Sequence, residues 1–213
     1  GAEALDFYRK SLRADPGLDD AAYRFQGLIA NQEDFDQAEK LYEELVKLAP
    51  GNGLIHNNFG LRLRDWAEPR GAQKPDPPTE VKRKIRRSSE VYEIAARLLP
   101  EDAQIQSDTG LLFEFYPCIR DDDKAQSYFT RSLELSDYCY RDAFDGLARL
   151  CRRAGRWQIL QEYAANVIDS LDNGGQAIAP VSGSEPQALL NETPGLRARA
   201  EAALREAEGH LKR

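Results

Sequence analysis

The stretch that decides the fold is DFDQAEKLYEELVKLAP, residues 34–50. Its apolar residues Phe35, Ala38 and Tyr42 follow one another at steps of three and four, which places them on one face of a helix. Pro50 ends the run, because proline lacks the amide hydrogen that a continuing helix needs. The stretch therefore predicts an amphipathic helix with a marked end.

The same ending recurs along the chain. Helical runs also end at Pro16 and at Pro100. Pro50 follows Pro16 by 34 residues, and Pro100 follows Pro50 by 50 residues, which is one further period of 34 with 16 residues inserted. A fixed period between about 20 and 50 residues is typical of solenoids, in which each repeat packs against its neighbours. The chain is therefore predicted to be an array of helical repeats.

The residues within each period resemble the tetratricopeptide repeat family. Residues 19–52 carry the family's large and small residues in order, namely Phe25, Ile29, Phe35, Ala38, Tyr42 and Leu45, and the next repeat carries Phe59, Gly60, Leu63, Ser88, Tyr92 and Ala95. Gln26 departs from the pattern, since the family places glycine or alanine there. The resemblance implies an all-α fold, a right-handed superhelical solenoid of antiparallel helix pairs with a C-terminal capping helix.

The resemblance also divides the chain. A repeat array is expected over 1–171, with a partial repeat at 1–18 and full repeats at about 19–52, 53–102, 103–140 and 141–171. The polar, proline-rich segment 67–79 is predicted to be a loop inserted in the second full repeat. A long loop over 172–192 and a capping helix over 193–213 are expected to follow. That helix is predicted to begin at Thr193-Pro194 and to bury Leu196, Ala200, Leu204, Ala207 and Leu211.

The partial repeat at the start matches only the second half of the family pattern, through Ala4, Tyr8, Ser11 and Pro16. The sequence contains no methionine and begins with Gly1-Ala2. We therefore expect the chain to be cut from a longer solenoid.

Composition narrows the functional classes. Charged residues make up 31% and hydrophobic residues 41% of the chain, as in globular proteins. The net charge of −7 makes nucleic acid an unlikely partner, and no apolar run is long enough to cross a membrane. Three cysteines without a CxxC spacing argue against a disulfide framework or a zinc site. A cytoplasmic protein is expected.

The sequence offers no catalytic set. It has two histidines, His56 and His210, far apart in sequence, and it lacks the common nucleotide-binding, hydrolase and metalloprotease motifs. The run Asp121–Asp123 lacks the alternating ligands of a calcium loop, and we interpret it as the acidic start of a helix. We therefore predict no enzyme activity, no cofactor and no bound metal.

The basic run Lys82, Arg83, Lys84, Arg86 and Arg87 is the most unusual local feature. Positive charge is disfavoured near a helix N-terminus. Three interpretations stand: a charge-balanced helix face in solvent, a contact with an anion, an acidic partner or nucleic acid, or regulation by phosphorylation at Ser89.

The family resemblance implies that the first helix of each repeat lines a concave groove for a peptide or a partner helix. The positions that would face the ligand are Tyr23, Arg24, Asn57, Asn58, Leu61, Arg64, Ser107, Asp108, Leu111, Arg149 and Arg152. Of the carboxylate clamp that some members use, Asn58 is kept, and Asp108 would repel a carboxylate.

The leading hypothesis is therefore a protein-interaction module, an adaptor or scaffold that binds a protein or peptide in this groove. Two alternatives remain: a regulatory or substrate-recruiting arm of a larger enzyme, and an anion or nucleic-acid contact through residues 82–87. Self-association through an exposed end of the solenoid is a further option.

Overall fold

The computed structural model describes residues 2–178 and 187–212, with the backbone alone for 187–192. The described chain forms two compact units. The first holds the residues up to Pro100 together with Tyr116–Ile119, and its helices are α1 (Ala2–Ala14), α2 (Asp19–Ala30), α3 (Phe35–Leu48), α4 (Gly53–Ala67), the short 3-10 helix η1 (Glu68–Arg70) and α5 (Thr79–Leu98). The second holds α6 (Ala103–Phe115), α7 (Asp122–Leu135), α8 (Arg141–Ala154), α9 (Trp157–Asp172) and α10 (Gln187–Leu211).

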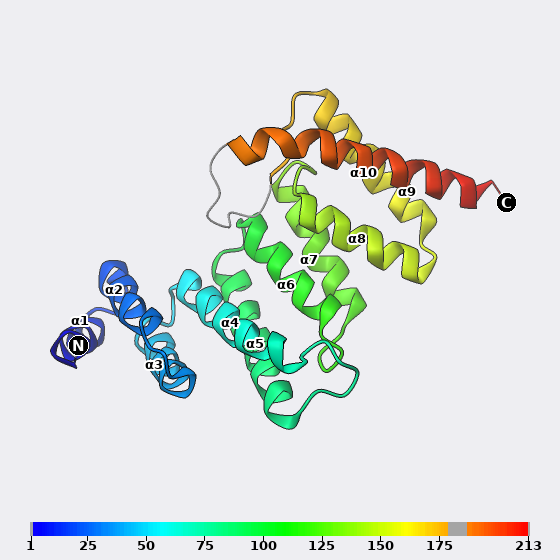
Figure 1. Ribbon diagram of the computed structural model, residues 1–213. Coiled ribbons are helices and arrows are strands. Elements are labelled where there is room, and N and C mark those ends of the chain that lie inside the picture. Colours follow the sequence, from blue (N-terminus) through cyan, green and yellow to red (C-terminus); the bar gives the residue numbers. More distant parts are fainter. Residues whose placement is uncertain (1, 179–186, 213) are drawn as a thin grey trace. The chain divides into compact units, whose positions relative to one another are not determined.

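Consecutive helices form antiparallel pairs in each unit (Figure 1). α4 packs against α5 in the first unit, and α6 packs against α7 in the second. An isolated bridge between Tyr140 and Ile178 is the sole strand-like contact among the described residues. The predicted all-α solenoid of helix pairs is confirmed.

Small residues allow the close packing within the pairs. A Cβ atom added to Gly60 of α4 would lie 2.5 Å from the Tyr92 ring of α5, and one added to Gly110 of α6 would lie 2.7 Å from the Phe129 ring of α7. Gly146 of α8 approaches the same Phe129 ring, and a Cβ added there would lie 2.4 Å from the ring atom Cζ. The positions that the repeat pattern assigns to small residues are thus the points where the helices meet large rings.

Aspartate side chains cap the first turns of several helices. The Asp34 carboxylate accepts hydrogen bonds from the amides of Asp36 and Gln37 at 2.9 and 3.2 Å. Asp102 accepts one from Ile105 at 3.0 Å, and Asp121 caps α7 in the same way. The interpretation of the Asp121–Asp123 run as a helix start is confirmed for Asp121.

The insertion 67–79 is mostly irregular, but it is anchored to the first unit. α4 continues to Ala67, η1 follows, and Gly71 turns the chain with a φ of +87°. Ala72 is fully buried, and the Tyr116 hydroxyl donates a hydrogen bond to the Glu68 carboxylate. The segment is therefore held at several points along its length.

The final helix begins earlier than predicted. α10 starts at Gln187, and Pro194 lies inside it. Thr193 does not cap the helix; its hydroxyl accepts a hydrogen bond from the Ala177 amide at 3.1 Å. The predicted start is wrong because proline is most typical of the first turn of a helix, whereas Pro194 lies inside α10. Residues 179–186 of the predicted loop 172–192 lie outside the described residues.

α10 packs along α9 and buries the predicted stripe in part. Leu196, Ala200 and Ala207 are fully buried in the core of the second unit. Leu204 is partly buried against this core, and Leu211 is exposed, so the buried stripe ends before the last turn. Ala203, which is not part of the predicted stripe, is also buried in this core.

His56 gives the first unit a dependence on pH. Burial lowers the pKa of its imidazole below the ordinary value of 6.5, with a further contribution from the Arg87 charge, although the Pro50 carbonyl opposes the shift. Below pH 6.5 the unfolded chain therefore takes up a proton at this residue before the folded chain does, and the free energy of unfolding falls. We expect the wild type to lose stability in urea titrations from pH 7.5 to 5.5. The loss should be smaller in His56→Asn, and equal losses in both proteins would contradict this origin.

Candidate protein-interaction groove

A pocket of about 240 Å³ opens between the helices of the first unit. It is lined by Gln26 and Ala30 of α2, Tyr42 of α3, and Asn58, Leu61, Arg62 and Asp65 of α4. Gln26 occupies the position at which the later repeats have Gly60 and Gly110. Gln26 therefore stands where those repeats place a glycine, and its side chain lines the pocket together with the Tyr42 ring.

The pocket wall has an unused hydrogen-bond acceptor. The Gln26 Oε1 atom is buried and has no hydrogen-bond partner among the described residues. The Oδ1 atom of the predicted groove residue Asn57 is also buried without a partner among them, but Asn57 does not line this pocket. A buried polar atom without a partner costs free energy that a bound donor would recover. Leu61 adds apolar surface to this wall.

The cationic group at the pocket rim is already oriented. The Arg62 guanidinium donates to the Gln32 carbonyl at 3.4 Å and lies 5.7 Å from the centre of the Phe35 ring. Asp65 supplies a carboxylate at the same rim. The pocket thus combines apolar surface, one charge of each sign and one free acceptor, which suits a segment of polypeptide.

The remaining groove residues of the first unit lie on α2 and α4. Tyr23 is exposed, and Arg24 pairs with Asp20 one turn earlier at 2.8 Å. Arg64 is partly buried and lies 3.7 Å from Asp65. The structure therefore places Asn58 and Leu61 in the pocket, with the other predicted residues of this unit on the same two helices.

In the second unit, several predicted groove residues are engaged within the unit. Ser107 is fully buried, so the prediction that it faces a ligand is wrong. α6 packs against both α7 and α8, which leaves little of its surface free. Asp108 and Leu111 are partly buried, and Leu111 packs against the core.

The two arginines predicted to line the groove on α8 have carboxylate partners. Arg149 forms a bidentate pair with the buried Glu114 of α6, with both distances at 2.8 Å. Arg152 pairs with Glu206 of α10 at 2.8 Å. Asp145, also on α8, pairs with Arg199 of α10. The capping helix therefore engages the side of α8 that a ligand was predicted to use.

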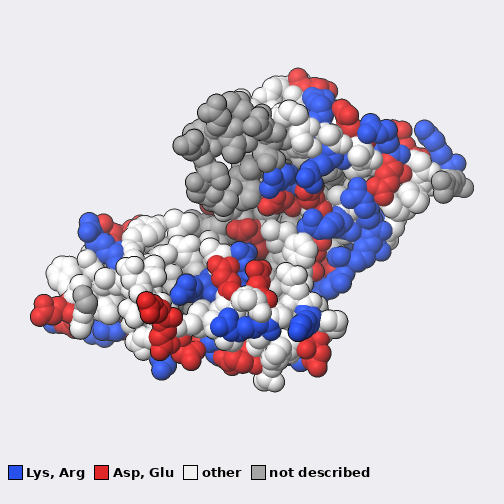
Figure 2. All heavy atoms as spheres, viewed as in Figure 1, with Lys and Arg blue, Asp and Glu red and all other residues white. Residues whose placement is uncertain are grey.

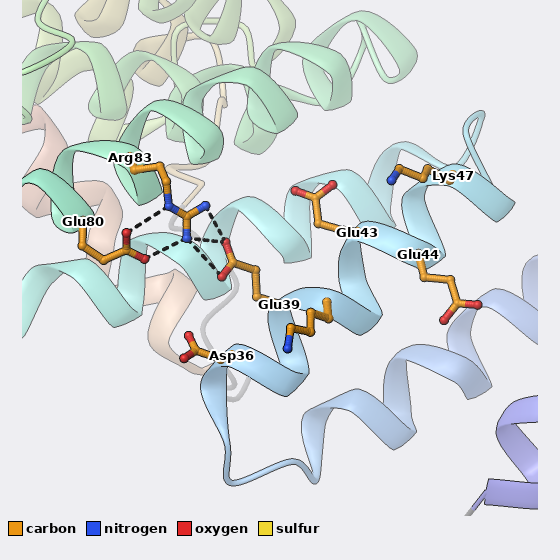
Figure 3. Close-up of a pocket in the computed structure, with 8 residues that line it drawn as sticks. Asp36, Glu39, Glu43, Glu44, Lys47, Glu80 and Arg83 are labelled. Carbon is orange, nitrogen blue, oxygen red and sulfur yellow. Dashed lines mark hydrogen bonds and ion pairs between the residues drawn. The ribbon is translucent and has the colours of Figure 1, made fainter.

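The basic run is paired with carboxylates of the same unit. Lys82 contacts Asp76 at 2.5 Å, and Arg83 lies between Glu80 and Glu39, at 2.7 and 3.3 Å (Figure 3). Arg87 pairs with Glu43 at 2.6 Å. The acidic residues come mainly from α3, whose carboxylates line an open hollow of about 620 Å³ beside α5. The charge-balanced interpretation therefore accounts for these three cations.

Lys84 is buried rather than exposed to an anion. Its ammonium group pairs with Glu39 and lies 3.3 Å from Glu80. It also lies 4.8 and 5.0 Å from the ring centres of Phe35 and Trp66. The predicted anion contact at Lys84 is therefore wrong, because an anion could not reach the buried ammonium group. Of the five cations, Arg86 is exposed, and no carboxylate among the described residues pairs with it.

On the face drawn in Figure 2, acidic and basic side chains are mixed over much of the surface, and basic side chains form one contiguous group toward the right of the view. Among the described residues, no helix is both long and apolar enough to span a bilayer.

Comparisons with known proteins identify the fold. No protein-family model matches the sequence, and no curated protein matches it. Among solved structures, the MamA protein is similar over 100% of this chain and 94% of its own, with a TM-score of 0.53 and 17% identity. A thermophilic TPR protein of Thermus thermophilus is similar over 94% of this chain and 88% of its own, with a TM-score of 0.51 and 18% identity.

The likeness, together with the helix pairs and their small contact residues, makes this an all-α repeat protein. More specifically, its fold resembles that of solved tetratricopeptide-repeat structures, and the predicted resemblance is confirmed at the level of the fold.

Proposed function

We propose that the chain is a protein-interaction module that binds a peptide or a helix of a partner protein at the pocket between α2 and α4. The observation that carries the proposal is the pocket of about 240 Å³ in which the predicted groove residues Asn58 and Leu61 meet the unpartnered acceptor of Gln26. The alternative role, as the recruiting arm of a larger enzyme, would use the same pocket and stays a prediction.

The pocket chemistry favours a ligand that donates hydrogen bonds. Gln26 offers a buried oxygen, and Asp65 offers a carboxylate in the pocket lining. Backbone amides or an amide or ammonium side chain of a ligand would satisfy these groups. An apolar ligand side chain beside Leu61 would add the hydrophobic contribution. Such a small site suggests an affinity on the order of micromolar, about −8 kcal/mol.

The proposal is tested by affinity capture from the native lysate with two variants. Leu61→Glu places a charge in the pocket, while Arg86→Ala changes an exposed residue outside it. We expect a partner that wild type and Arg86→Ala retain and that Leu61→Glu loses. Circular dichroism and thermal melting first establish that Leu61→Glu is folded, because Leu61 is partly buried.

A second pocket variant separates loss of binding from loss of folding. Asn58→Arg fills the pocket with a long side chain from a position that is only partly buried. If the partner remains bound to both folded pocket variants, the pocket is not the binding site. If instead Arg86→Ala alone releases the partner, the basic run is the contact, and the alternative hypothesis replaces this one.

A further inference from the structure

The second unit carries a group of arginines around the start of α7. Arg120 lies two residues before α7, and Arg153 lies in the last turn of α8. Arg156 follows the turn at Gly155, whose φ of +65° ends α8. The contiguous group of basic side chains in Figure 2 lies over α8. A chain with a net charge of −7 thus presents a locally basic surface.

Two of these arginines share a single carboxylate. Arg120 donates from Nε and Nη2 to the two oxygens of Asp122, at 2.9 and 3.3 Å. Arg153 donates from Nη2 and Nε to the same two oxygens, at 3.0 and 3.2 Å. The hydrogen bond from Arg120, followed by that from Arg153, lowers the pKa of Asp122, so its carboxylate stays ionised. Two positive charges therefore face one negative charge.

Both guanidiniums keep donors for a second anion. The Nη1 groups of Arg120 and Arg153 have no acceptor among the described residues, and the two side chains are 42% and 38% exposed. A planar guanidinium binds a carboxylate through parallel charge-assisted hydrogen bonds. Because Asp122 already orients both groups, an incoming carboxylate would order them at little cost in side-chain freedom.

Arg156 has only a weak carboxylate partner. Its guanidinium donates to the Gln126 side chain and lies 3.4 Å from Asp123. Asp123 is 87% exposed, and such a solvent-exposed ion pair contributes little free energy. A carboxylate of a ligand could therefore take the place of Asp123 at this arginine.

The surroundings favour a polypeptide as the source of the carboxylates. Arg149 precedes Arg153 by one helical turn, and its guanidinium lies 5.0 Å from the centre of the Phe115 ring, which is exposed. A polypeptide can place an apolar side chain beside this ring. It can also space its carboxylates so that they avoid Asp123, whereas the continuous phosphate chain of a nucleic acid would bring charge opposite that residue.

We propose that the surface formed by Arg120, Arg153 and Arg156 binds an acidic segment of a partner protein. Carboxylates of that segment accept from the free donors of Arg120 and Arg153, and a further one replaces Asp123 at Arg156. This surface lies in the second unit and is independent of the pocket between α2 and α4.

The probe is a fluorescently labelled peptide of alternating glutamate and glycine, and binding is followed by fluorescence anisotropy. We expect the dissociation constant to rise at least about tenfold in Arg120→Gln/Arg153→Gln, which circular dichroism first shows to be folded. The matched control, Lys10→Gln/Arg131→Gln, removes the same charge from exposed residues, and Arg131 is 42% exposed, as Arg120 is. It should bind within about twofold of wild type.

Asp123→Asn removes the competing carboxylate and should tighten binding about threefold or more. Unchanged or weaker binding by this variant would overturn the proposal, as would absence of binding to wild type. An equal loss in Lys10→Gln/Arg131→Gln would do so as well, because only net charge would then matter. A single-stranded oligothymidylate of the same charge that binds more tightly than the peptide would assign the surface to nucleic acid. In sedimentation velocity, an oligomer that Arg120→Gln/Arg153→Gln dissolves would assign it to a second copy and refute the partner protein.

Discussion

Replacing Phe129 with alanine is expected to lower the free energy of unfolding by about 3–5 kcal/mol, the largest effect of any single substitution considered for this chain. The ring is fully buried, and it sits between Gly110 of α6 and Gly146 of α8. Its removal would leave a cavity bounded by three helices. Because two of its neighbours are backbone without side chains, little material is available to fill that cavity.

The reciprocal change should also be costly. A methyl group at Gly146 would lie 2.5 Å from the Cε2 atom of the Phe129 ring, so Gly146→Ala is expected to cost about 1–3 kcal/mol through overpacking. Urea denaturation of both variants measures these losses. Gly209, with open space around its Cβ position, provides the control, and Gly209→Ala should leave stability unchanged or slightly raised. If Gly146→Ala were as stable as wild type, the close contact would be refuted.

Removing the Glu39 carboxylate should give the second large loss, about 3 kcal/mol for Glu39→Ala. Glu39 is the nearest carboxylate to the buried Lys84 ammonium group. Without it, the cation keeps Glu80 at 3.3 Å and Asp36 at 3.7 Å, both of which are largely exposed. A buried charge that loses its main partner is more costly than the absence of both charges.

Removing the cation should therefore cost less than removing its carboxylate partner, and this difference can be measured. Lys84→Met replaces the cation by an apolar side chain beside Phe35 and Trp66, and we expect it to change stability by less than about 1.5 kcal/mol. Glu80→Ala removes an exposed partner and should cost less than about 1 kcal/mol. Urea titrations of the three variants provide the comparison. A Lys84→Met loss larger than that of Glu39→Ala would show that the ammonium group, and not its pairing, stabilises the fold.

The fold could be predicted from the sequence because every repeat has to meet the same two requirements, close helix contacts and defined helix ends. Gly60 and Gly110 recur where the two helices of a repeat meet a large ring, and Pro50 and Pro100 recur where a helix stops. The helix caps at Asp34 and Asp102 follow from local chemistry alone. Pro194 shows the limit, since its place within a helix depends on packing that no local pattern encodes.

The candidate site was harder to predict, because side-chain partners far apart in sequence decide which residues are available. Arg149 and Lys84 look exposed in a sequence, yet Glu114 and Glu39 engage them from 35 and 45 residues away. Ser107 looks like a groove residue until the burial of α6 is known. The departure at Gln26 was visible in the sequence, and it marks the pocket that the structure contains.

The two tryptophans give each unit its own optical reporter. Trp66 belongs to the first unit, where it faces the Lys84 ammonium group and lies against Phe35 at a ring separation of 5.3 Å. Trp157 belongs to the second, where it stacks on His210 of α10 with ring centres 3.8 Å apart. Single-tryptophan proteins would therefore record the melting of each unit separately, and superimposable fluorescence transitions would identify the whole chain as one cooperative block.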